Sequence, residues 1–396
     1  MEKYGEYSYA ITVVGILTML SVLGFPMLIV REGAKNIVNE NWPLLRGLIR
    51  LSHFVVIPFS LLLSLLAVIL ALEIDDKSNS SIVIAVISLL PLVVVSAAIQ
   101  LQASVLQGLK FIIASQIPSL IIQRVGFIVI LFLLVFFWQE KVTLFNVIAI
   151  QISMSFVALI CSYIMYKTRL PKQLGLTSPS YNTLSWIKSA ATFLLISGVY
   201  LINKQTDILM IGFYLEPSKI GIYRAVIQGS DLVVLVLIVG NLVIQPHIAS
   251  LYAKGDTVKL QKLITRTARI IMLSCLPMFI SLLFFGDYFL TLFGNEFIDG
   301  TKSLTILATG QLVNVFFGSV GVVLSMAGYE RDTLYGVAIA AIVNIVLNMI
   351  YIPEWGIEGA AFASSVSLVI WNIILAGMVN YRTGLHTTAL GVIRLK

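Results

Sequence analysis

Ionisable side chains inside long apolar stretches are the residues of this sequence that could do chemistry. Arg124 lies near the middle of the stretch at residues 114–137, and Lys204 and Asp207 lie three residues apart in the stretch at 187–214. At the centre of a bilayer each such charge would cost at least about 2.5 kcal/mol, which makes it a candidate for function. The guanidinium of Arg124 has the geometry to bind a phosphate group of a substrate. Alternatively, it could pair with a carboxylate, or its long side chain could extend to the inner surface of the membrane. Asp207 could take up a proton or a sodium ion, or simply neutralise Lys204.

Three further charges are candidate binding groups on weaker grounds. Asp231 lies deep within the apolar stretch at residues 220–246, so it could contact substrate. Arg224 lies seven residues earlier on the same helical face, near the outer end, where it could instead mark the membrane interface. Arg31 directly follows an apolar stretch, where it could bind phosphate, although an anchor for the inner end of the helix is the favoured interpretation.

Uncharged polar residues have simpler expected roles. Asn344 and Asn348 have the i, i+4 spacing of one helical face, so we expect them to hydrogen-bond between helices rather than to contact substrate. We expect Tyr223 in an aromatic belt at the outer boundary of the membrane, together with Tyr4, Tyr7, Tyr9 and Tyr214.

The sequence carries none of the residue patterns that typify catalysis or metal binding. Cys161 and Cys275 lie inside apolar runs, and the three histidines are far apart, so neither a metal cluster nor a cofactor is predicted. A glycine-rich phosphate loop ending in Lys-Ser or Lys-Thr is absent as well, so nucleotide hydrolysis is not expected. We therefore predict that the protein is not an enzyme.

The composition places these charges in a membrane. Of 396 residues, 59% are hydrophobic and only 11% are charged, whereas soluble domains carry roughly 25% charged residues. The mean hydropathy of +0.98 agrees. Because a membrane helix needs about 20 apolar residues, we expect an all-α polytopic membrane protein with eleven spans. They lie near residues 7–30, 51–71, 81–104, 114–137, 144–166, 187–214, 220–246, 270–285, 304–326, 334–352 and 357–379.

The distribution of Lys and Arg predicts the orientation of these spans. With the N-terminus outside, 18 of the 26 Lys and Arg residues lie on the inner side and six on the outer side, as the positive-inside rule requires. The net charge of +7 is therefore explained by orientation against an anionic leaflet, and no nucleic-acid partner is expected.

A weak internal repeat organises the spans. Gly5-Glu6-Tyr7 matches Gly221-Ile222-Tyr223 at a shift of 216 residues, and matches at a shift near 220 pair Pro26 with Pro246 and Gly108 with Gly328. The repeat aligns residues 187–214 with a segment that would precede Met1. We therefore expect a twelve-helix plan of two parallel-repeat bundles, with eleven helices present and the first one missing. The expected parts are an N-terminal bundle at 1–166, a cytoplasmic linker at 167–186 and a C-terminal bundle at 187–396.

Several motifs, taken in order, carry a family resemblance. The opening Tyr4–Ala10 segment resembles the loop after the first helix in oligosaccharide flippases, which are polysaccharide exporters of the multidrug/oligosaccharidyl-lipid/polysaccharide exporter superfamily. The segment 221–225 is similar to the second-half copy of that element. The segment 207–212 resembles a stretch of the seventh helix in the family, and the segment from Asn344 to Ala363 resembles its penultimate hairpin.

The resemblance implies a flippase that moves lipid-linked oligosaccharide from the inner to the outer leaflet by alternating access, for cell-surface polysaccharide assembly. It implies the plasma membrane as location, membrane lipids as surroundings, and polysaccharide polymerase and glycosyltransferases as candidate partners. A drug/cation antiporter of the same superfamily is the alternative, and the cations Arg124 and Lys204 favour an anionic substrate over it. A membrane enzyme or an assembly scaffold is a more distant alternative.

Overall fold

The structure is a computed structural model, and it describes residues 2–74, 80–138 and 143–391. Of the cations used for the orientation, Lys77, Lys141, Arg394 and Lys396 lie outside the described residues. The described residues form helices joined by short loops, with no β-strand among them. The all-α expectation is therefore confirmed.

The chain divides into two compact units, Met1–Leu194 and Leu195–Lys396. The helices of unit 1 are α1 (Glu2–Ser21), α2 (Phe25–Val38), α3 (Trp42–Ile74), α4 (Ser80–Leu89), α5 (Pro91–Gly108), α6 (Ile112–Gln116), the π-helix η1 (Ile117–Val125), α7 (Gly126–Trp138), α8 (Leu144–Arg169) and α9 (Lys172–Leu176). The helices of unit 2 are α11 (Pro217–Ala253), α12 (Thr257–Thr291), the 3₁₀ helix η2 (Asn295–Gly300), α13 (Thr301–Phe317), α14 (Val320–Ala327), α15 (Glu330–Trp355) and α16 (Ile357–Thr383).

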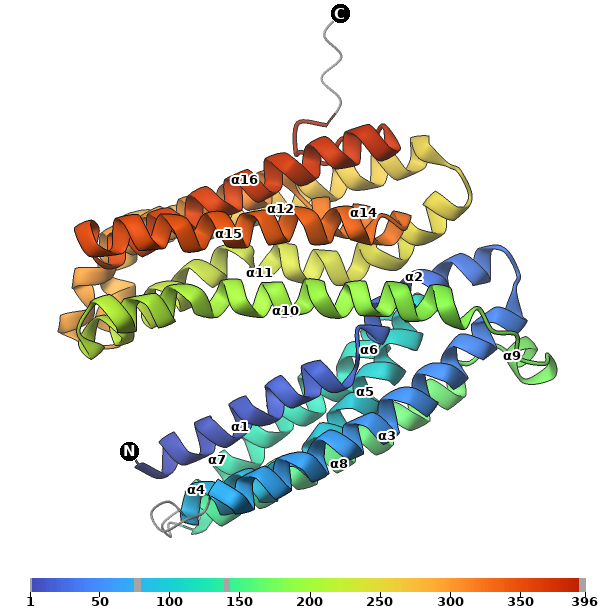
Figure 1. The fold of residues 1–396 in the computed structure, drawn as a ribbon, viewed down its shortest axis with the longest axis horizontal. Helices are drawn as coiled ribbons and strands as arrows, with labels where there is room; N and C mark the ends of the chain where they lie inside the picture. The colour runs from blue at the N-terminus through green and yellow to red at the C-terminus, as the bar shows by residue number, and fades with distance from the viewer. Residues whose placement is uncertain (1, 75–79, 139–142, 392–396) are drawn as a thin grey trace, which may run out of the picture. The chain divides into compact units, whose positions relative to one another are not determined.

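One long helix, α10 (Thr183–Tyr214), contains the boundary between the two units at Leu194 and Leu195, and Figure 1 shows it as one continuous helix. Its first turns lie in unit 1, where Trp186, Ala190 and Phe193 are buried. Its later turns lie in unit 2, where Ile211 joins the apolar core formed by α11, α12, α13, α15 and α16. A single helix therefore supplies core residues to both units.

The described helices account for the expected spans. Nine of them are long and apolar enough to cross a membrane, and the number rises to eleven if each of two bent helix pairs counts as one span. The pairs are 9–21 with Phe25–Val38, bent by 44°, and 295–317 with Val320–Ala327, bent by 41°. The span predicted at 270–285 is longer than expected, because α12 runs from Thr257 to Thr291. The protein is a multi-pass membrane protein.

The first bend results from local backbone geometry. Leu23 and Gly24 both have positive φ, of 51° and 74°, between α1 and α2. A Cβ on Gly24 would lie 2.2 Å from the carbonyl oxygen of Ala190 in α10, so a larger residue could not take this place without backbone movement. In contrast, α11, which the repeat aligns with α1 and α2, continues through Pro246. The two copies of the repeat therefore differ in shape.

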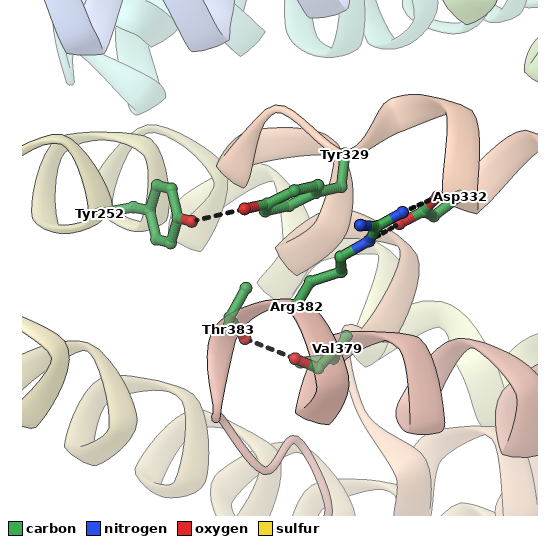
Figure 2. A network of polar contacts seen from close by, with 6 residues as sticks. All are labelled: Tyr252, Tyr329, Asp332, Val379, Arg382 and Thr383. Carbon is green, nitrogen blue, oxygen red and sulfur yellow. Dashed lines mark hydrogen bonds and ion pairs between the residues drawn. The ribbon is translucent and has the colours of Figure 1, made fainter.

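In unit 2, polar contacts connect the C-terminal ends of α11 and α16 with the N-terminal end of α15 (Figure 2). The hydroxyl of Tyr252 donates to that of Tyr329 over 3.3 Å. Arg382 forms two hydrogen bonds with the carboxylate of Asp332, at 2.6 Å from Nε and 3.2 Å from Nη2. The guanidinium also lies 5.5 Å from the ring centroid of Tyr329. These contacts fasten α11, α15 and α16 together at the predicted inner side.

Candidate functional site

The carboxylate of Asp207 is buried in unit 2, with 5% of the residue exposed. Its Oδ2 accepts hydrogen bonds from the hydroxyl of Tyr223 at 2.7 Å and from that of Ser364 at 2.5 Å. Its Oδ1 accepts from the side-chain amides of Asn348 at 2.8 Å and Asn344 at 3.3 Å. Four uncharged donors thus replace the water that a buried carboxylate loses.

The donors of this Asp207 cluster, defined as Asp207, Tyr223, Asn344, Asn348 and Ser364, also contact one another. Asn348 donates to Oδ1 of Asn344 over 3.1 Å, and Asn344 donates to Oγ of Ser364 over 3.0 Å. Oδ1 of Asn348 is buried and accepts no hydrogen bond within the part of the chain that the structure describes. The five side chains therefore form one connected hydrogen-bond network, in which Oδ1 of Asn348 still has capacity to accept a hydrogen bond.

Four helices supply the cluster. Asp207 comes from α10, Tyr223 from α11, the two asparagines from α15 and Ser364 from α16. Asn344 and Asn348 lie one turn apart, so their side chains lie one above the other on the face of α15. Their predicted hydrogen bonding between helices is confirmed, because both reach Asp207 on α10.

A cavity of about 300 Å³ lies beside the cluster within unit 2. Its lining residues are Tyr200, Asn203, Lys204, Asp207, Ile227, Ser230, Asp231, Leu307, Gln311, Ala340, Asn344, Ser364, Ser367, Leu368 and Trp371. Three charged side chains, three amides and three serine hydroxyls thus share the cavity with two aromatic rings, whose centroids (Tyr200 and Trp371) are 5.1 Å apart. Such a lining can hydrogen-bond hydroxylated or charged groups inside an otherwise apolar helix bundle.

Lys204 does not pair with Asp207 as the i, i+3 spacing predicts. Its Nζ lies 3.4 Å from Oδ2 of Asp231 on the neighbouring helix α11. Asp207 instead turns toward α15 and α16, where it is saturated by uncharged donors. The long side chain of Lys204 reaches the cavity, and its partner there is the carboxylate of Asp231. Of the two roles considered for Asp207, neutralising Lys204 is therefore not the one that it has in the structure.

The expected place of Tyr223 at the membrane interface is also wrong. Tyr223 is fully buried, because its ring packs in the core of unit 2 and its hydroxyl binds Asp207. Buried neighbours at Ile222, Ala225, Val226 and Gly229 place it on the inward face of α11. That helical spacing of small and apolar residues is the sequence signal that could have revealed it.

The other candidate cations have different surroundings. Arg124 is exposed on η1, and no hydrogen bond or ion pair joins it to another described residue. Arg224 is exposed on α11, again with no such bond to a described residue. Arg31 is buried in unit 1, where its guanidinium contacts Glu32 at 3.2 Å and Ser189 at 3.1 Å. Its Cζ also lies 5.4 Å from the ring centroid of Phe193, so Arg31 binds α2 to α10.

Comparison with known families matches the chain from its start. The sequence profile of the family described as "Polysaccharide biosynthesis protein" matches residues 1–252, more than half of the chain. The chain belongs to this family. A second profile, MatE, matches residues 189–350. The polysaccharide biosynthesis match includes Asp207 and Tyr223, and the MatE match adds Asn344 and Asn348 to these two.

Two curated relatives of this family member come from Haloferax volcanii. They are the "Probable low-salt glycan biosynthesis flippase Agl15", 25% identical over 171 residues, and the "Probable flippase AglR", 26% identical over 171 residues. The matches cover 43% and 42% of this chain. They span 36% of the length of each relative.

Solved transporter structures have the same fold as this member of the polysaccharide biosynthesis family. The crystal structure of MATE in the bent conformation aligns with a TM-score of 0.78 at 12% identity, over 96% of this chain and 88% of that chain. A MOP superfamily transporter from Pyrococcus furiosus aligns with a TM-score of 0.74 at 14% identity, over 96% and 87%. At these identities the likeness concerns the fold alone, and it agrees with the two-bundle plan.

Proposed function

We propose that the protein is a flippase that moves a lipid-linked oligosaccharide from the inner to the outer leaflet of the plasma membrane. The observation that carries the proposal is the polar cavity of about 300 Å³ inside a membrane bundle. A sugar and its phosphates cannot cross hydrocarbon unaided, because unpaired polar groups cost several kcal/mol each there. Hydroxyl, amide and charged groups in a cavity replace the lost water. The name of the Haloferax volcanii relative Agl15, a glycan biosynthesis flippase, supports the same substrate class, and the name of AglR supports the same activity.

The proposed transport cycle is alternating access between two bundles, residues 1–166 and 187–396, joined by a linker at 167–186 on the cytoplasmic side. The lipid tail stays in the bilayer while the sugar passes through the polar interior. The oligosaccharide would be destined for cell-surface polysaccharide, with polysaccharide polymerase and glycosyltransferases as partners. The protein would make and break no covalent bond, so it would not be an enzyme.

Arg124 and Lys204 are the proposed cationic contacts of the anionic head of the substrate, with Arg31, Arg224 and Asp231 as further binding residues. Arg124 supports this role because it is a cation on an apolar span without a described partner. Its guanidinium can bind two phosphate oxygens at once. We expect Arg124→Ala to abolish transfer while the protein still accumulates and folds, and Arg124→Lys to retain part of it.

The Asp207 cluster is the proposed site of the coupling ion, either a proton or sodium. Its carboxylate, amide and hydroxyl oxygens are hard ligands, and the free lone pair of Asn348 adds one more. A proton or a sodium ion would neutralise the buried charge of Asp207. It would thereby weaken the charge-assisted hydrogen bonds that hold α10 to α15 and α16. This makes the cluster a reasonable place to link ion binding to a helix movement.

A single reconstitution tests these proposals. Vesicles that contain the protein and a fluorescent undecaprenyl- or dolichyl-linked oligosaccharide should show transfer between leaflets that depends on the protein. Mass spectrometry of the recovered lipid should find its mass unchanged, since a mass change would indicate an enzyme. Unchanged leaflet distribution would refute the flippase proposal.

The alternative, a drug/cation antiporter, is favoured by one observation, the buried acidic residue Asp207 in a chain that also matches MatE. The same vesicles test it when they are loaded with a cationic dye and given a proton or sodium gradient. Strong dye efflux without oligosaccharide transfer would replace the flippase proposal with the antiporter.

A further inference from the structure

A basic groove of about 540 Å³ runs along the first half of α12 in unit 2. Its cations Lys262, Arg266 and Arg269 follow the i, i+4, i+7 spacing of one helical face. The remaining lining residues are Gln261, Thr265, Ile270 and Leu273. The groove is separate from the cavity beside Asp207, since no residue lines both.

The three cations form no ion pair with any carboxylate in the described residues. This differs from Lys259 one turn earlier, whose Nζ lies 2.9 Å from Oδ2 of Asp256. It differs also from Arg382, which pairs with Asp332. Three positive charges within about two helical turns repel one another, so an anion from outside the protein would relieve that repulsion.

The C-terminal segment fixes one of these cations in position. Gln261 exchanges two hydrogen bonds with the backbone of His386, at 2.7 and 2.8 Å. Arg269 donates from Nε to the carbonyl of Ala389 at 3.0 Å and from Nη2 to that of Leu390 at 3.1 Å. These neutral carbonyls hold the guanidinium without cancelling its charge. Donors of Arg269 remain for a further acceptor, because a guanidinium carries five N–H groups.

Apolar side chains continue the groove toward the middle of the span. Ile270 is 54% exposed and Leu273 is 68% exposed, one and two turns beyond Arg266. With a rise of 1.5 Å per residue, Lys262 and Leu273 are separated by about 17 Å along the helix. The groove therefore changes from cationic to apolar over the distance that separates a phospholipid headgroup from the upper part of its acyl chains.

We propose that this groove binds a phospholipid with an anionic headgroup. Its phosphate lies between Lys262, Arg266 and Arg269, and an acyl chain lies along Ile270 and Leu273. The lipid belongs to the leaflet at this end of unit 2, which the distribution of Lys and Arg predicts to be the inner one. Free phosphate would satisfy the cations but would leave the apolar part of the groove unused. The site is independent of the proposed transport activity.

Native mass spectrometry of the full chain in detergent tests the proposal, with phosphatidylglycerol and phosphatidylcholine offered at equal concentration. Wild-type protein should retain phosphatidylglycerol preferentially. The double variant Lys262→Gln/Arg266→Gln, which keeps Arg269 and its contacts to the C-terminal segment, should lose roughly tenfold or more of that affinity. The matched control is Lys254→Gln/Arg331→Gln, which removes two exposed cations outside the groove and should retain the lipid.

Three results would overturn the proposal. The first is an equal loss of phosphatidylglycerol in the control variant, which would mean that only the overall charge matters. The second is displacement of the lipid by inorganic phosphate at equal concentration, which would make this a simple anion site. The third is unchanged retention in Leu273→Ser, which would exclude the acyl contact.

Because all these positions are exposed, thermal unfolding of the variants should match that of the wild-type protein. The single variants Lys262→Gln and Arg266→Gln should each bind the lipid about threefold more weakly.

Discussion

Asp207 and Asp231 line the same cavity of unit 2 and have opposite surroundings. Asp207 is buried and accepts hydrogen bonds from four uncharged side chains. Asp231 has a side chain that is 42% exposed, and its partner is Lys204, whose side chain is 65% exposed. A charge that is solvated by fixed dipoles in the interior depends on every donor, whereas a charge near solvent can exchange its partner for water. The two carboxylates should therefore respond very differently to substitution.

The largest effect is expected for Asp207→Ala. The substitution leaves the donors of Tyr223, Ser364 and the two asparagines without an acceptor, at about 1–3 kcal/mol for each buried group that finds no other partner. We expect the free energy of unfolding to fall by roughly 3 kcal/mol or more, and ion-dependent transfer to be lost. Thermal unfolding in detergent and the vesicle assay measure the two effects.

The milder variant Asp207→Asn separates stability from ion coupling. It keeps the size and one acceptor oxygen of the side chain, so most of the fold stability should return while ion dependence does not. If transfer by the Asp207→Asn variant depends on the ion as strongly as transfer by the wild-type protein, Asp207 has no part in the coupling mechanism.

A smaller effect is expected for Tyr223→Phe. The ring stays packed in the core, and only the donor 2.7 Å from Oδ2 of Asp207 is removed. Hydrogen bonds to charged groups contribute about 1.5–3 kcal/mol, so unfolding should become easier by that amount. Tyr214→Phe, which removes the hydroxyl of an exposed tyrosine on α10, is the matched control and should change stability by less than about 0.5 kcal/mol. Equal stability of Tyr223→Phe and wild type would mean that Asp207 is not a buried, charged acceptor.

The smallest effect is expected for the exposed pair. Exposed ion pairs contribute about 0.2–1 kcal/mol, so Asp231→Asn and Lys204→Gln should each change stability by less than about 1 kcal/mol. A double-mutant cycle of the two positions in low and high salt measures the coupling, which should weaken with salt. A coupling above about 2 kcal/mol would contradict the contrast with Asp207. Loss of transfer in Lys204→Gln at unchanged stability would support its proposed contact with substrate.

Much of the fold could be predicted from the sequence, because lipid imposes a simple rule. Spans such as residues 144–166 and 357–379 are continuous apolar stretches, and they recur as α8 and α16. The break between α1 and α2 was harder to predict. It depends on the positive φ of Leu23 and Gly24 and on the close approach of Ala190, which lies far away in the sequence.

The candidate site was only partly predictable. Asp207 stood out because a carboxylate is expensive inside an apolar span. Asn344 and Asn348 stood out as residues that hydrogen-bond between helices, but nothing in the sequence connected them with Asp207, and neither Tyr223 nor Ser364 was expected beside it. The i, i+3 rule pointed to Lys204 as the partner because it considers one helix alone. The actual partners come from three other helices that are up to 157 residues away in the chain.

The sequence by itself determined that the chain is a helical membrane protein, which helices span, and where rare charges interrupt them. These properties follow from the amino-acid composition and from the pattern of apolar and charged residues along the sequence. Only the tertiary structure decided that Asp207 is held by uncharged donors, that Asp231 pairs with Lys204, and that three cations of α12 border an apolar groove. The physical reason is that the energy of a charge depends on the dipoles and charges within a few ångströms, and the packing of helices distant in sequence chooses those neighbours.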